Sequence, residues 1–244
     1  MKKRTFLAFV AIGAIFGADA ASQDTPRALW LDTTSGAVVG PGKEVKSNAK
    51  RSDTGQKPLG PPALRVNTGL MYYIDRERPG GRLERVLPST TFHSGERIRL
   101  QLMSNVAGRL RISQRNPDGT SDVLFPDSRV NGGDDRIEAR TLAVLPSGKD
   151  WFTFDKNPGE EHILVELRPQ GSSAEPEPMR AEIPRKETRE RTEEVALLAE
   201  GLKTRGLKME IDDSKASPAT YCVMPAGKVL PQGVLAVEIV LVHR

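Results

Sequence analysis

The feature that most constrains the fold is a series of short segments, between residues 64 and 168, in which polar and apolar residues alternate. Residues 96–102, Glu-Arg-Ile-Arg-Leu-Gln-Leu, show the alternation most clearly, and residues 109–113 repeat it. A period of two places every second side chain on the same face of a β-strand, so each segment predicts a strand with one buried face. Further strands are predicted at residues 65–74, 123–125, 141–145, 151–154 and 162–167.

Turn residues separate these strands at spacings of about ten residues, which is typical of all-β domains. The clearest turn is Asn116-Pro117-Asp118-Gly119, where the glycine supplies a positive φ and predicts a hairpin. We therefore predict a mostly β fold, an antiparallel sandwich or barrel-like domain over residues 64–168, with one short helix and disordered flanks.

The first twenty residues have the pattern of a cleavable signal peptide. Three basic residues at 2–4 precede an apolar run from Phe6 to Phe16, and Ala18-Asp19-Ala20 forms a small-x-small cleavage site. The apolar run of about eleven residues is shorter than the roughly 20 needed to span a bilayer. We expect residues 1–20 to be removed, which leaves a periplasmic or secreted protein that begins at Ala21 and has no membrane span.

The segments that flank the predicted domain are poor in apolar residues. Hydrophobic residues make up 37% of the chain, against about 45 to 50% in average globular domains. We expect a flexible N-terminal segment at 21–63, with Leu29-Trp30-Leu31 as its docking point, and a charged linker at 169–192. A short helix is predicted at 193–207, with Thr192 as its N-cap. The apolar residues of 219–244 predict C-terminal strands that dock on the β domain.

Charge and cysteine content exclude two classes of protein. The net charge of +4 falls to +2 once the signal peptide is removed, and acidic and basic residues alternate, so we expect no nucleic-acid partner. Cys222 is the only cysteine, which rules out an internal disulfide. Its apolar neighbours Tyr221 and Val223 predict a buried thiol.

Residues from about 66 to 167 resemble a bacterial family named domain of unknown function 4384. The resemblance lies in an ordered set of features: Phe92 to Leu100 with Gly95-Glu96, Gly108 to Ile112, Asp118-Gly119, Leu124-Phe125-Pro126, Leu145-Pro146 and Pro158-Gly159-Glu160-Glu161. It implies an extracytoplasmic β module with no assigned activity, and it carries over no catalytic residues. We expect this chain to depart from the usual arrangement of the family, in which a partner domain is attached.

The residues with catalytic or metal-binding chemistry do not form a known motif. The three histidines, His93, His162 and His243, lack the paired spacing of a zinc site. His93 and Ser94 with a later aspartate would satisfy the composition of a hydrolytic triad, but no Gly-x-Ser-x-Gly elbow accompanies them. Asp118, Thr120 and Asp122 resemble half of a calcium loop, but Val123 and Arg129 stand where the loop needs Gly and Glu. We predict no catalytic, cofactor or metal site.

Three residues are candidates for ligand contact: Trp151, Asp127 and Asn131. In a strand at 151–154, Phe152 and Phe154 share one face and pack in the core, which leaves Trp151 on the other face. The leading hypothesis is a non-enzymatic module that binds an envelope or secreted protein. The alternative is a carbohydrate or peptidoglycan binding module that uses Trp151 and the loop at 126–135, and a hydrolase ranks third.

Overall fold

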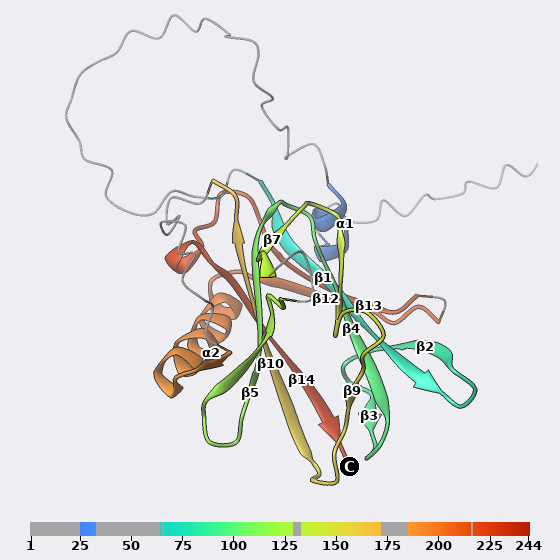
Figure 1. Ribbon diagram of the computed structural model, residues 1–244. Coiled ribbons are helices and arrows are strands. Elements are labelled where there is room, and N and C mark those ends of the chain that lie inside the picture. The colour runs from blue at the N-terminus through green and yellow to red at the C-terminus, as the bar shows by residue number, and fades with distance from the viewer. Residues whose placement is uncertain (1–24, 33–63, 65, 129–132, 172–184, 216) are drawn as a thin grey trace, which may run out of the picture.

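The fold was analysed in a computed structural model of the chain. The structure describes residues 25–32, 64, 66–128, 133–171, 185–215 and 217–244 (Figure 1). The predicted signal peptide and most of the predicted flexible segment 21–63 lie outside these residues. The described residues form a mostly β fold with two sheets, which confirms the predicted fold class.

The first sheet, called sheet A, has the strand order β12-β13-β1-β4-β8, with β2 paired to β1 and β9 paired to β4. Its strands are β1 (Thr68–Arg78), β2 (Arg82–Val86), β4 (Arg97–Ser104), β8 (Leu142–Leu145), β9 (Phe152–Thr153), β12 (Lys208–Asp212) and β13 (Ala219–Met224). All of its pairs are antiparallel. β1 lies inside the sheet, between β13 and β4.

The second sheet, sheet B, has the order β11-β6-β5-β10-β14-β3, with β7 paired to β5. Its strands are β3 (Thr91–Phe92), β5 (Gly108–Arg115), β6 (Ser121–Phe125), β7 (Arg136–Ile137), β10 (Gly159–Pro169), β11 (Lys186–Glu187) and β14 (Leu235–His243). β5 and β6 form the predicted hairpin, with Gly119 at φ +84° in its turn. Only β14 and β3 are parallel among the described pairs.

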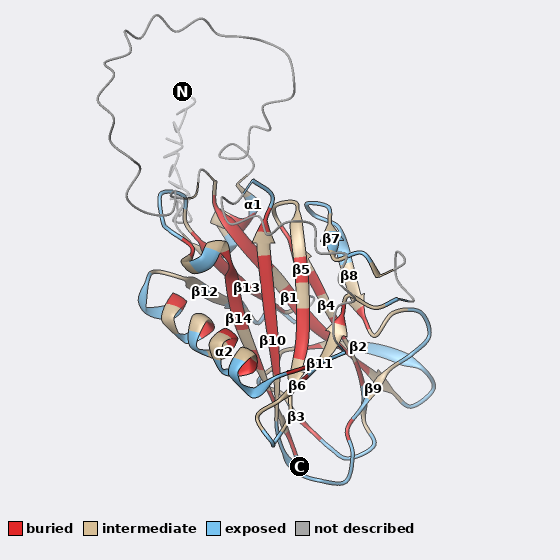
Figure 2. Ribbon diagram, turned by 60° about the vertical axis from the view of Figure 1, so that its left-hand side comes forward, coloured by how far each residue is buried: buried red, intermediate tan, exposed pale blue. Residues whose placement is uncertain are grey.

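Apolar side chains from both sheets form one main core, drawn in red along the central strands in Figure 2. In β4, buried residues alternate strictly with more exposed ones, as the period of two predicts. Leu100 and Leu102 of β4 are 1% exposed, and Leu110 and Leu235 of sheet B are 1% and 0% exposed. Fully burying each such side chain stabilises the fold by about 1.5 to 3 kcal/mol.

The C-terminal segment is part of both sheets. β13 pairs with β1, from Thr68 opposite Met224 to Tyr72 opposite Thr220. β14 pairs along its nine residues with β10, and it lies inside sheet B because β3 pairs with its other side. The β fold therefore extends beyond residues 64–168, since strands that follow residue 207 complete each sheet.

Helix α1 (Pro26–Leu31) is a short helix with Thr25 as its N-cap. Trp30 is 4% exposed and packs edge-on against Tyr221 of β13, with ring centroids 5.7 Å apart. These two residues belong to a second, smaller core on the outer face of sheet A, together with Ala219 and Val223. The part of segment 21–63 that is described is thus an ordered helix.

Helix α2 (Arg189–Thr204) begins four residues before the predicted start at 193, and Thr188 rather than Thr192 caps it. The Thr188 hydroxyl accepts a hydrogen bond from the backbone N–H of Arg191 at 3.3 Å. Residues 186–187, placed in the linker by the sequence, form β11 and pair with β6. The linker prediction 169–192 is wrong over residues 186–192, because they form β11, the N-cap and the first turn of α2, and Glu187 is buried and pairs with Arg111 of sheet B.

Candidate functional site

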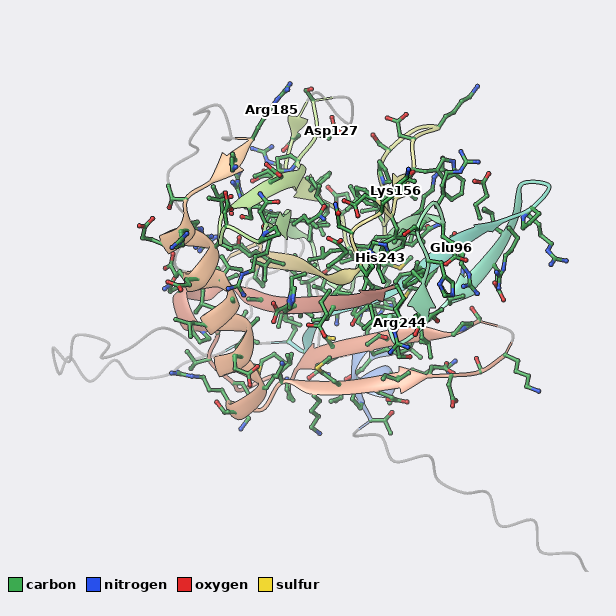
Figure 3. The ribbon with its side chains drawn as sticks, turned by 90° about the horizontal axis from the view of Figure 1, so that it is seen from below. Glu96, Asp127, Lys156, Arg185, His243 and Arg244 are labelled. Carbon is green, nitrogen blue, oxygen red and sulfur yellow. The ribbon has the colours of Figure 1, made fainter. Side chains whose placement is uncertain are left out.

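The predicted ligand-contact residues come from different parts of the fold. Trp151 directly precedes β9 of sheet A. Asp127 follows β6 of sheet B, after a cis peptide bond between Phe125 and Pro126, and is labelled in Figure 3. Asn131 lies outside the described residues. The structure therefore describes two of the three candidates, in loops that leave opposite sheets.

Trp151 is half-buried beneath two arginines. The guanidinium carbon of Arg99 lies 4.2 Å from its ring centroid, and that of Arg97 lies at 5.7 Å. Arg99 is itself held by its Nε, which donates to the Asp150 carbonyl at 3.0 Å, and by a second bond to the Gly148 carbonyl. A sugar platform needs an open aromatic face, so a guanidinium fixed over this ring opposes that use.

The serine suggested for a hydrolytic triad contacts a different histidine. Ser94 Oγ lies 3.3 Å from Nε2 of His243, which is 149 residues further along the chain and 1% exposed (Figure 3). The His243 ring packs on Phe154, which stacks on Phe92. Among the described residues, its buried Nδ1 has no hydrogen-bond partner. The acid that orients the base of a triad is thus not in place, and the pair joins the C-terminal end of β14 to the turn before β4.

The other polar residues with candidate chemistry are held in local structure. Asp118 Oδ1 accepts from the backbone N–H of Thr120 at 2.9 Å, and the hydroxyl and backbone bonds of Thr120 lower the pKa of Asp118. Burial raises the pKa of the Cys222 thiol to about 12, so the thiol stays protonated at neutral pH. Among the described residues, no group of three or more His, Cys, Asp or Glu side chains converges to hold a metal.

A charged hollow of about 420 Å³ lies where β11 meets the first turn of α2. Its lining residues are Arg111, Lys186, Glu187, Thr188 and Arg191. Arg111 of β5 pairs with Glu187, and Arg191 pairs with Glu194 at 2.9 Å and with Glu166 of β10. The Arg191–Glu166 pair joins the start of α2 to β10, and the Arg111–Glu187 pair joins β5 to β11 within sheet B.

Glu166 is a buried acid of this cluster, with a side chain that is 8% exposed. Burial raises its pKa, and the attraction of Arg191 offsets only part of that effect. Burial also acts to lower the pKa of Arg191, but Glu166 and Glu194 outweigh it and the net direction is upward. The Oε1 of Glu166 is buried without a hydrogen-bond partner among the described residues, which also disfavours the charged carboxylate.

A second hollow, of about 170 Å³, opens between the two sheets. Its walls are mostly apolar, and they include Ile98, Phe152 and Ile163, with the acids Asp155 and Glu161 among the lining residues. Backbone and side-chain bonds from Asn157 lower the pKa of Asp155. At this size the hollow is smaller than the roughly 300 Å³ at which typical small-molecule sites begin.

Strand β12 is one of the outer strands of sheet A, and sequence reasoning missed it. Within the described part of the chain, β12 pairs with β13 alone. Met209 lies opposite Cys222 of the main core, and residues that face each other across antiparallel strands share a sheet face. Met209 and Ile211 therefore continue the inner face of sheet A, yet they are 45% and 58% exposed.

The opposite face of β12 is charged and contacts α1. The Arg27 guanidinium pairs with Asp212 at 2.7 Å, and the Arg27 backbone N–H donates to Glu210 Oε2 at 2.9 Å. The signal for this strand in the sequence is Lys-Met-Glu-Ile-Asp, an alternation that the nearby charged residues conceal. β12 thus combines an outer strand edge with exposed apolar side chains, the features of a surface on which another strand can pair.

Comparisons with known proteins identify one region of the chain. No helix within the described residues has the length and apolar character to cross a bilayer. No curated protein and no solved structure matches the chain. Residues 91–167, from the start of β3 into β10, match the model of the domain of unknown function DUF4384, which confirms the family resemblance found in the sequence.

Proposed function

We propose that this chain is an exported, non-enzymatic β module that binds another protein through the outer edge of β12, in the periplasm or outside the cell. The observation that carries the proposal is the exposure of Met209 and Ile211 on a strand whose outer edge meets no other described strand. Strand addition at such an edge supplies main-chain hydrogen bonds, and alternate side chains supply specificity.

The export part of the proposal rests on the basic, apolar and small-residue pattern of residues 1–20. Its test is the intact mass of the protein recovered from the periplasm or medium of an expressing bacterium. We expect a chain that begins at Ala21. A recovered chain that keeps residues 2–16 would contradict export by cleavage.

Two contacts support protein binding over the alternatives. The Arg99 guanidinium over Trp151 opposes a sugar platform. The arginines that line the charged hollow already pair with Glu187, Glu166 and Glu194. These ion pairs hold α2 against β10 and join β5 to β11, so they have a structural role.

Site-specific photo-cross-linking in living cells tests the binding surface. A photoreactive amino acid replaces Met209 in one variant and Leu83 in the control, because Leu83 is 50% exposed and lies on β2, another outer strand of sheet A. We expect a single adduct of defined mass from position 209 and none from position 83. Equal adducts at both positions, or none at 209, would contradict the proposed surface.

A further inference from the structure

We infer that the partner of β12 is a second copy of this chain, paired antiparallel about a two-fold axis at Glu210. The inference rests on the proposed function and specifies its partner. Two-fold dimers use the same surface on both subunits, so a strand that pairs with its own copy must be complementary to itself when reversed. β12 meets that condition at four of its five positions.

The reversed strand brings unlike charges and like apolar groups together. With Glu210 at the centre, Lys208 of one chain lies opposite Asp212 of the other, and Met209 lies opposite Ile211. Directly opposed residues on antiparallel strands interact most strongly, and both opposite charges and apolar pairs are favourable there. The two apolar pairs form on the face where Met209 and Ile211 are exposed in a single chain.

The other long edges of the described fold lack this self-complementarity. β2 reads Arg-Leu-Glu-Arg-Val, so reversal about its centre places Leu83 opposite Arg85 and Arg82 opposite Val86. β8 has four residues and is followed directly by Pro146, whose ring lacks the N–H that a continued ladder needs. The outer strands of sheet B, β3 and β11, have two residues each. Short edges of this kind resist pairing with another chain.

One position, Glu210, destabilises the dimer, and this gives the inference a specific test. Glu210 lies opposite its own copy, and like charges directly opposed across strands are destabilising. The Arg27 backbone N–H bonds Glu210 within each chain, which fixes this carboxylate near the axis. Glu210→Gln therefore strengthens dimerisation, whereas a strand with a purely internal role gives no reason for a gain.

The first test measures self-association of the purified full chain by sedimentation equilibrium up to about 100 µM, a range suited to a small interface. We expect a monomer–dimer equilibrium in which Ile211→Lys weakens association by roughly tenfold or more and Glu210→Gln strengthens it. Leu83→Lys, at an equally exposed site on β2, leaves it unchanged. A wild-type chain that is monomeric throughout would overturn the inference, as would equal effects of Ile211→Lys and Leu83→Lys.

The second test remains decisive where a single variant is poorly folded, because it measures recovery on mixing. Lys208→Asp places two acids opposite each other in its own dimer, and Asp212→Lys places two lysines there. Each variant alone should associate about tenfold or more weakly than wild type, and a mixture of the two should form a heterodimer, because both opposed pairs then carry unlike charges. A mixture that associates no better than its components overturns the inference.

The cross-linking result at position 209 also distinguishes a failure of the dimer inference from a failure of the proposed function on which it rests. A cross-linked adduct from position 209 with twice the mass of the chain supports the second copy. An adduct with a different protein overturns the second copy and leaves the protein-binding function standing. A monomeric chain whose position 209 forms cross-links only within its own molecule contradicts both.

Discussion

The segment that matches DUF4384 and the segments on either side of it contribute differently to the same two sheets. The matched residues 91–167 supply strands such as β4, in which buried and exposed residues alternate. The unmatched segments supply β13, whose six residues are all buried, and β1 and β14, which lie inside their sheets. The alternating strands face solvent on one side, whereas β13 is covered by the core on one face and by α1 on the other.

This difference shows that a recurring sequence segment is not by itself a folding unit. β4 pairs along seven register positions with β1, and β10 pairs along nine with β14. Neither partner belongs to the matched residues. The matched strands therefore need strands from outside the match to pair their edges and to close the core, and the following experiments test that dependence.

The largest effect is expected from deleting residues 233–244, which removes β14. The deletion exposes the edge of β10 and removes Leu235, Ile239 and Leu241 from the core. Their burial contributes about 1.5 to 3 kcal/mol each, a sum comparable with the whole stability of a typical domain. We expect an insoluble product or one without a cooperative thermal transition. A deleted chain that is soluble and melts at the wild-type temperature would falsify the dependence.

Matched core truncations sharpen the comparison. Leu235→Ala in β14 and Leu110→Ala in β5 remove equally buried side chains, one outside the family match and one inside it. Each should lower the free energy of unfolding by about 2 to 5 kcal/mol, as measured by urea denaturation. A loss confined to Leu110→Ala would instead indicate that the matched segment carries the stability alone.

A smaller effect is expected from Trp30→Ala, because α1 packs on the outer face of sheet A and can detach without opening the main core. The substitution removes the Trp30–Tyr221 contact and exposes part of β13. We expect a loss of about 1 to 2 kcal/mol and faster proteolysis near α1. A loss as large as that of Leu235→Ala would mean that α1 belongs to the central folding unit.

The smallest effect is a change in pH dependence on Glu166→Gln. Because burial raises the pKa of Glu166, the folded chain binds a proton more tightly than the unfolded chain. The free energy of unfolding from this group is highest below the ordinary carboxyl pKa and falls as pH rises through the raised value. Urea denaturation across this window should show a weaker fall in the variant than in wild type. Parallel curves would place the proton on another group.

The class of fold could be predicted from the sequence, but two strands of sheet A could not. β4 and β5 follow from alternation, because one face of each contacts the core. β2 and β12 are rich in charged residues, and their place in the sheet depends on pairing with β1 and β13. The alternation Lys-Met-Glu-Ile-Asp is present in β12, but its charged residues and those nearby conceal the strand.

The candidate site was harder to predict because it depends on contacts between residues that lie far apart in the sequence. Nothing in the sequence near Ser94 indicates His243, because only the closure of sheet B brings them together. Trp151 was predicted inside a strand at 151–154 but directly precedes β9, and the arginine that stacks on it lies 52 residues earlier in the chain. The exposure of Met209 and Ile211 depends on β12 ending the sheet, which no local pattern encodes.

The separation of β10 and β14 in the sequence also determines how long after its synthesis β10 can pair with β14. His162 and Glu238, whose Nδ1 and Oε1 atoms lie 3.0 Å apart, are separated by 76 residues. At synthesis rates of about 5 to 20 residues per second, β10 waits roughly 4 to 15 seconds for its neighbour. During that interval its apolar face and its backbone edge are open to other chains. The arrival of β14 therefore closes a strand edge that would otherwise be open to pairing with another chain.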